Sequence, residues 1–376
     1  MTRRFQLMIT SFLIVFMMID CSPLEKNIQE LNWDIAAELP PEEGAPASIG
    51  YAGPVAGAHN GVLLIGGGAN FPDGMPWHGG AKKYHDELWV YKPATNIFQL
   101  FRLPHTLAYS ANVSTQNGVI SIGGENEQGL ISEVLMTQWN GREAVVSRLP
   151  SLPIAITNAA AAVAGSSLYV AGGETKEAAS ARFFTMDMND TAAGWKELQS
   201  LPQATSHAVL AAVNGSKLFL AGGRKKTPSG ISDLYATLYE YDIAANEWRQ
   251  KKSMPYSLCA GTGTVINDEY IVLFGGDRGE TFHKAESVIK QINHETDSSI
   301  KARLNEEKIK IQSAHPGFSK EVLWYNIHTD EWTAQGFIPF DVPVTTTAVD
   351  MNGKIYLPTG EIKAGVRTPQ ILQVSY

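Results

Sequence analysis

The sequence predicts an all-β fold, a six-bladed β-propeller with a helical insertion in its fifth blade. An apolar strand that ends in a pair of glycines recurs along the chain, and a strand rich in tyrosine or tryptophan follows it. A further strand with an aromatic residue after a polar turn completes most copies. The copies are mostly about 50 residues apart, so each repeat has the length and the four short strands of one propeller blade.

The glycine-ended strand occurs six times. The copies are LLIGG ending at Gly67, ISIGG at Gly124, LYVAGG at Gly173, LFLAGG at Gly223, IVLFGG at Gly276 and a degenerate IYLPTG at Gly360. The following strands include ELWVY, TLYEYD and VLWYN, and the outer strands contain Phe98, Trp195, Trp248 and Trp332. This combination resembles the kelch family, and we expect the aromatic side chains to fill the gaps between neighbouring blades.

The sixth repeat ends with its third strand, ILQVSY, and has no tryptophan strand after it. Residues 31–35, LNWDI, contain a tryptophan strand that belongs to no other blade. We therefore predict that this segment forms the outer strand of blade six and that the propeller comprises residues 31–376. Such closure leaves no open sheet edge at either end of the repeat series.

Two insertions interrupt the regular spacing. Residues 70–83, NFPDGMPWHGGAKK, fall between the second and third strands of blade one. Residues 284–319 in blade five are charged and have spaced apolar positions, which predicts helix. Long insertions in a compact domain are more often functional than not. The helical one is either a lid over one end of the propeller or a solvated decoration.

Composition limits the function classes. Of the 376 residues 44% are hydrophobic, which suits a large core and excludes a disordered chain. The net charge of -8 argues against a nucleic-acid surface but leaves room for a basic pocket that binds a small anion. The two cysteines, Cys21 and Cys259, give no disulfide framework, and we expect Cys259 to be a buried small apolar residue.

The first residues are typical of a secretory signal: Arg3 and Arg4 precede an apolar stretch at residues 5–19. That stretch is about 15 residues, shorter than the roughly 20 of a spanning helix. We expect residues 1–20 to be a signal peptide and residues 21–30 a tether. Cys21 is either lipidated, or ordinary cleavage occurs nearby and the cysteine is lost or free. The protein is then exported, to the periplasm or as an outer-membrane lipoprotein of a Gram-negative bacterium.

Charged residues recur at one mouth of the predicted central channel, because the loop after the second strand and the loop before the first strand open on the same face. The candidate binding residues are Glu125, Glu174, His207, Arg224, Asp277 and Arg278. Each could equally cap a turn or form an ion pair. The last blade adds TGEIKAGVRT, where a turn at Ala364 and Gly365 places Glu361 opposite Arg367. A simple cross-strand ion pair is the structural alternative.

This hairpin, GGGANFPDGMPWHGGAKKYHDELWVY in blade one and IGGENEQG in blade two together resemble the N-acetylneuraminate epimerase family, the sialic acid mutarotases. The blade order looks circularly permuted relative to that family. The resemblance implies that Glu361 is the proton acceptor and Arg367 its partner. It also implies a small sugar acid as the substrate and no need for a cofactor or a metal. Thr205 stands where some relatives have an arginine.

The implied reaction interconverts the α and β anomers of N-acetylneuraminate through the open-chain form. It needs a base for the anomeric hydroxyl and an acid for the ring oxygen. Glu361 suits the base, and the permanently charged Arg367 suits the sugar carboxylate or a developing oxyanion. The acid has no candidate. The alternative function is a non-catalytic kelch module that binds glycans or a protein partner. Copper chemistry lacks a Tyr/His/Cys ligand set.

Export and anchoring are testable by cell fractionation combined with labelling by a radioactive fatty acid. We expect an exported protein without residues 1–20, and label that a Cys21→Ser variant loses. A cytoplasmic pool that keeps residues 1–20 would contradict export, whereas export without label would remove the lipid anchor alone.

Overall fold

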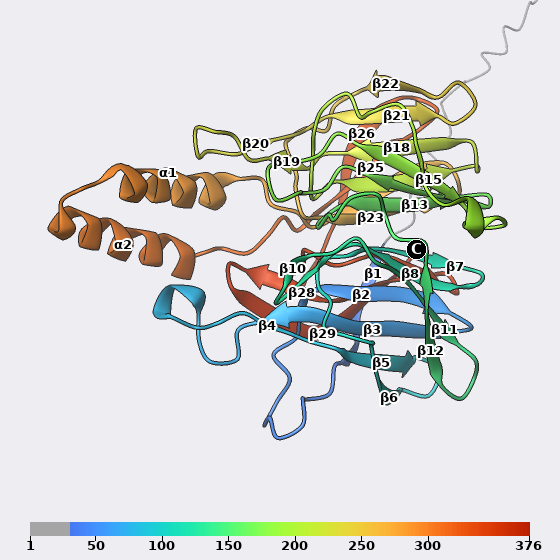
Figure 1. Cartoon of the computed structure of the whole chain (residues 1–376), viewed down its shortest axis with the longest axis horizontal. Helices are drawn as coiled ribbons and strands as arrows, with labels where there is room; N and C mark the ends of the chain where they lie inside the picture. The colour runs from blue at the N-terminus through green and yellow to red at the C-terminus, as the bar shows by residue number, and fades with distance from the viewer. Residues whose placement is uncertain (1–30) are drawn as a thin grey trace, which may run out of the picture. The chain divides into compact units, whose positions relative to one another are not determined.

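A computed structural model describes residues 31–376 and confirms the six-bladed β-propeller. Each blade is an antiparallel sheet, and the blades follow one another in chain order (Figure 1). Blade one contains β2 (Ala52–His59), β3 (Val62–Asn70), β5 (Glu87–Lys92) and β6 (Ile97–Arg102), with β4 (Lys83–Tyr84) paired to β3. Blade two contains β7 (Ala111–Thr115), β8 (Gly118–Ile122), β11 (Val134–Trp139) and β12 (Ala144–Leu149).

The remaining blades repeat this four-stranded order. Blade three contains β13 (Ala160–Ala164), β14 (Ser167–Ala171), β15 (Phe183–Asp187) and β16 (Lys196–Glu197). Blade four contains β17 (Val209–Val213), β18 (Lys217–Ala221), β21 (Leu238–Asp242) and β22 (Glu247–Lys251). Blade five contains β23 (Thr262–Ile266), β24 (Tyr270–Phe274), β25 (Glu321–Asn326) and β26 (Glu331–Phe337). Blade six contains β27 (Val349–Met351), β28 (Lys354–Lys363), β29 (Val366–Ser375) and β1 (Asn32–Glu38).

Short elements decorate the blades. They are the hairpins β9 (Glu125–Asn126) with β10 (Gly129–Leu130) and β19 (Arg224–Lys225) with β20 (Asp233–Leu234), and the 3-10 turns η1 (Pro76–His78) and η2 (Thr191–Ala193). The signal peptide, the tether and Cys21, all expected within residues 1–30, lie outside the described residues.

The closure predicted for blade six is confirmed. β1 pairs antiparallel with β29, and Trp33 stands opposite Val374 in that ladder. The Trp33 ring meets the Phe274 ring of blade five edge to face, with 5.6 Å between their centres. The amino-terminal strand thus completes one blade and also packs against its neighbour.

A closed ring of six backbone hydrogen bonds joins the blades around the channel. One residue of each blade donates its N–H to the carbonyl of the equivalent residue in an adjacent blade, at 2.8 to 3.0 Å. This residue lies two or more places before the innermost strand of its blade, except in blade one, where it lies within that strand. The members in chain order are Gly53, Tyr109, Asn158, His207, Ala260 and Thr345. All six have left-handed φ, between 51° and 64°, although only one of them is glycine. This conformation is costly for residues with a Cβ, so the ring imposes it.

The hydrophobic core lies between neighbouring blades. A cluster shared by blades three and four contains Tyr169, Phe183 and Tyr241. Phe183 meets Tyr241 edge to face at 4.9 Å and contacts Trp248 at 5.2 Å. The aromatic strands therefore fill the gaps between blades, as their spacing predicted.

The blade-five insertion is helical, as predicted, but its first helix begins slightly earlier than residue 284. α1 (Glu280–His294) and α2 (Ser298–Ser313) form a pair that projects from the blades (Figure 1). Asp297 caps α2 by accepting hydrogen bonds from the N–H groups of Ser299 and Ile300. Within residues 31–376, neither helix has the length and apolar character needed to cross a membrane.

Because β1 closes blade six, we expect a substitution in this strand to lower the stability of the fold measurably. Trp33→Ala should lower the free energy of unfolding by about 2–3 kcal/mol, because it removes a large interblade side chain that is only partly buried. Urea unfolding followed by circular dichroism measures this change. Ile97→Ala, at a half-exposed position on the outer strand of blade one, is the control and should have little effect. Equal effects of the two substitutions would contradict the closing role of Trp33.

Candidate active site

The six blades present equivalent positions at one mouth of the channel. In five blades the residue after the glycine pair forms a β-bridge with the residue just before the hydrogen-bonded ring. These five are Glu125, Glu174, Arg224, Asp277 and Glu361. Blade one has Ala69 at the same position, paired with Ala52. The repeat therefore determines the backbone positions of these residues. Which side chain each blade has at that position determines what the mouth can bind.

A cavity of about 220 Å³ lies at this mouth, between blades four, five and six and the helical insertion. Its charged and titratable lining residues are His207, Arg224, Cys259, Asp277, His315 and Glu361. The insertion contributes Thr281, Phe282, Ala285 and Gln312 from the two helices, and His315 and Phe318 from the segment after them. Of the two alternatives for the insertion, the structure supports a lid, because these residues form one wall of the cavity.

Glu361 and Arg367 face each other across the β28–β29 hairpin, as the Ala364–Gly365 turn predicted. Arg367 Nη1 lies 3.6 Å from Glu361 Oε1. The same carboxylate oxygen accepts a hydrogen bond from the Gly365 N–H at 2.7 Å. Glu361 lines the cavity, whereas the Arg367 side chain is only 5% exposed. The guanidinium therefore compensates the charge of a carboxylate that a ligand can reach.

The blade-one insertion holds this hairpin from the other side. The Arg367 guanidinium lies over the Phe71 ring, 4.7 Å from its centre, and Arg367 Nε donates to the Ala69 carbonyl at 3.3 Å. Gly365 has a left-handed φ of 75°, and a Cβ there would come within 3.2 Å of the Trp77 ring. A side chain at this turn would therefore push the hairpin away from the insertion.

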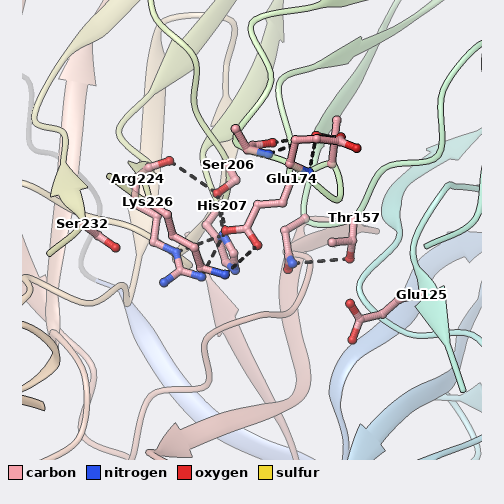
Figure 2. A network of polar contacts seen from close by, with 12 residues as sticks. Glu125, Thr157, Glu174, Ser206, His207, Arg224, Lys226 and Ser232 are labelled. Atoms are coloured by element: carbon pink, nitrogen blue, oxygen red, sulfur yellow. Dashed lines mark hydrogen bonds and ion pairs between the residues drawn. The ribbon is translucent and has the colours of Figure 1, made fainter. Parts of the chain in front are cut away.

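A second charge network lies on the blade-four side of the mouth. Figure 2 shows Glu174 where the contacts meet: its carboxylate accepts from Ser206 at 3.1 Å and from Arg224 at 3.3 Å, and Lys226 lies 3.6 Å away. Burial lowers the pKa of His207 well below its usual value, and Arg224 and Lys226 lower it further. His207 is therefore neutral at pH 7, and the network has more positive than negative charge.

Arg224 connects this network to the helical insertion. Its guanidinium lies over the Phe282 ring of α1, 5.1 Å from the ring centre, and it lines the cavity with its side chain 14% exposed. Asp277 also lines the cavity, and its Oδ1 accepts from the Gly279 N–H just before α1 begins. The cavity thus has a cation on one wall and carboxylates on two others.

The structure does not bring every predicted residue to the cavity. Glu125 accepts hydrogen bonds from Tyr84 at 2.8 Å and Lys82 at 3.0 Å, and in Figure 2 it lies apart from the Glu174 network. Arg278 pairs with Glu321 and lies over the Tyr256 ring at 3.7 Å. Neither of these two residues is part of the cavity lining.

Several residues that form the site have no signal in the sequence. His315 and Phe318 lie in the segment 284–319, which is predicted only as helix, Phe282 lies just before it, and Cys259 is expected only to be a buried small apolar residue. Their spacing follows the fold of the insertion rather than the blade repeat. Across residues 31–376, no three His, Cys, Asp or Glu side chains gather as they would around a metal ion.

The fold and the mouth residues define a kelch-type β-propeller with a charged cavity at one end of its channel. The N-acetylneuraminate epimerase family model matches residues 149–376, more than half of the chain. The chain belongs to the N-acetylneuraminate epimerase family. Both the helical insertion and the Glu361–Arg367 hairpin lie within the matched residues.

Individual relatives match over a similar length. An N-acetylneuraminate epimerase from Brucella melitensis biotype 1 is 30% identical over 227 residues, which cover 59% of this chain and 57% of the relative. Those from Haemophilus influenzae and Pasteurella multocida are 26% and 24% identical, each over 60% of this chain and 58% of the relative. The chain therefore spans less than two thirds of the length of these relatives. The match is limited to one continuous run of this chain, as a circularly permuted blade order would give. The permutation itself stays a prediction.

Because the Cys259 thiol is buried in the cavity wall, we expect it to react slowly with thiol reagents. Burial raises the pKa of Cys259 to about 12, with Asp277 acting in the same direction. At pH 8 roughly one thiol in 10⁴ is then ionised. A Cys21→Ser variant should react with a maleimide far more slowly in the native state than after unfolding in urea. Equal rates would show that Cys259 is open to solvent and would contradict the described cavity wall.

Proposed function

We propose that this protein catalyses the interconversion of the α and β anomers of N-acetylneuraminate. The observation that supports this most directly is the Glu361 carboxylate, which faces the cavity beside the nearly buried Arg367. The names of the relatives support the same substrate. Mutarotation is a proton-transfer reaction, so a positioned carboxylate is the main chemical requirement.

Glu361 is the base that removes the proton of the anomeric hydroxyl. One fixed donor holds its carboxylate group, the Gly365 N–H at Oε1, and the Arg367 guanidinium forms an ion pair with the same oxygen at 3.6 Å. The guanidinium compensates the charge of this carboxylate within the cavity wall. The second carboxylate oxygen has no hydrogen-bond partner within residues 31–376 and is available to the sugar.

The sugar carboxylate binds at Arg224 in this proposal. Arg224 lines the cavity, and its planar guanidinium can hold a carboxylate through two parallel hydrogen bonds. Glu174 compensates Arg224 only in part, since its oxygens also contact Ser206 and Lys226. The cation therefore retains attraction for an anionic ligand. Arg367, which is not part of the lining, acts on Glu361.

The alternative is a kelch module that binds glycans or a protein partner without catalysis. A binding module needs a complementary surface, but it does not need an accessible carboxylate beside a buried guanidinium. That pair favours the enzyme, and measured turnover separates the two functions.

The proposal predicts faster anomer conversion. Fresh α-N-acetylneuraminate, released in place by a sialidase, should convert to the β anomer faster with the protein than without it, as followed by proton NMR. Glu361→Gln keeps the size of the side chain but removes the base, and should reduce the catalysed rate by about 10²-fold or more. Circular dichroism should show an unchanged fold.

Glu307→Gln, an exposed position on α2, is the matched control and should keep the wild-type rate. Binding of sialate without any acceleration by the wild-type protein would favour the binding module. A fully active Glu361→Gln variant would show that another residue is the base.

A further inference from the structure

His315 is a cavity residue for which the proposed function has no task so far. It follows α2, is 8% exposed, and lines the same cavity as Glu361 and Arg224. Its ring packs beside Phe318, with 5.0 Å between the ring centres. The helical insertion thus places an imidazole on the cavity wall formed by the lid.

The hydrogen bonds of His315 decide which ring nitrogen holds a proton. Nδ1 accepts a hydrogen bond from the Gly317 N–H at 3.1 Å. A ring nitrogen that accepts cannot also hold a proton, so the proton of the neutral imidazole is on Nε2. Within residues 31–376, Nε2 has no hydrogen-bond partner. His315 therefore has one N–H group available to a ligand.

The surroundings keep this imidazole neutral. Burial lowers the pKa of His315 below its usual 6.5, and Lys363 acts in the same direction, whereas the carboxylates of Asp277 and Glu361 act to raise it. A positively charged ring would also turn an Nδ1–H toward the Gly317 N–H. Neutral imidazole is a hydrogen-bond donor that does not neutralise the nearby base.

We propose that His315 is a further catalytic residue, whose Nε2–H donates a hydrogen bond to the ring oxygen of the sugar acid. This inference rests on the proposed function. As the bond between the anomeric carbon and the ring oxygen breaks, its electron pair moves to the ring oxygen, and Glu361 takes the anomeric hydroxyl proton. A donor fixed at the oxygen where charge develops stabilises that transition state.

The proton balance closes without a separate acid. The anomeric oxygen and the ring oxygen are bonded to the same carbon, so one carboxyl group can serve both. Glu361 gives the proton it has taken to the ring oxygen, and the open-chain ketone results. Reclosure on the other face of the carbonyl reverses these transfers. His315 keeps its proton throughout, which agrees with an Nδ1 that is occupied by Gly317.

Three substitutions test this role by initial rates of anomer conversion at several sialate concentrations. His315→Phe and His315→Leu both remove the donor, and they differ in size. Each should lower kcat by on the order of 10²-fold with a smaller change in KM, because the hydrogen bond strengthens in the transition state. His315→Gln retains a side-chain N–H donor and should recover a large part of kcat. His294→Leu, at an exposed position at the end of α1, is the control within the same insertion.

The outcomes separate this inference from the proposed function. Circular dichroism identifies which donor-free variants fold like the wild type, and the loss of kcat must appear in those. A folded donor-free variant within about twofold of the wild-type kcat would overturn the role of His315 and leave the function standing. A His315→Gln variant as impaired as the donor-free variants would also overturn it. Absence of acceleration by the wild-type protein would refute the proposed function and this inference together.

Discussion

The closed ring of six backbone hydrogen bonds is the interaction on which the rest of the molecule depends. It forces non-glycine residues such as Tyr109, Ala260 and Thr345 into left-handed backbone conformations. Each of these costs about 1–2 kcal/mol, so the ring is stable only because every blade supplies one donor and one acceptor. No blade can move outward without breaking two of these bonds. The interblade aromatic contacts stabilise the same arrangement from outside.

The ring also determines the geometry of the cavity mouth. The residue just before a ring member bridges to the residue after the glycine pair, so Arg224, Asp277 and Glu361 start from equivalent places. His207 belongs to the ring and also lines the cavity. The repeat therefore places the charged residues of the mouth, and the two insertions add Phe71 beside Arg367 and His315 to the cavity lining.

Features that are determined by the blade repeat could be predicted from the sequence. Glycine pairs and aromatic strands predicted six blades, the unpartnered Trp33 strand predicted the closure, and the turn before Arg367 predicted that it faces Glu361. Contacts that depend on the folding of an insertion were beyond prediction. Nothing in the spacing of His315 shows that a loop amide binds its Nδ1, or that Arg278 would pair with Glu321 instead of reaching the cavity.

The pairing of β1 with β29 has a consequence for the order of folding. Almost the whole described chain lies between these two strands, so their ladder is among the most non-local contacts in the molecule. Such contacts form late, because the entropy of closing so long a loop must be overcome first. β29 also forms one side of the hairpin with Arg367. During synthesis β1 therefore remains an unpaired edge until β29 is made, whereas the Glu361–Arg367 contact lies within one hairpin and does not depend on that long-range ladder.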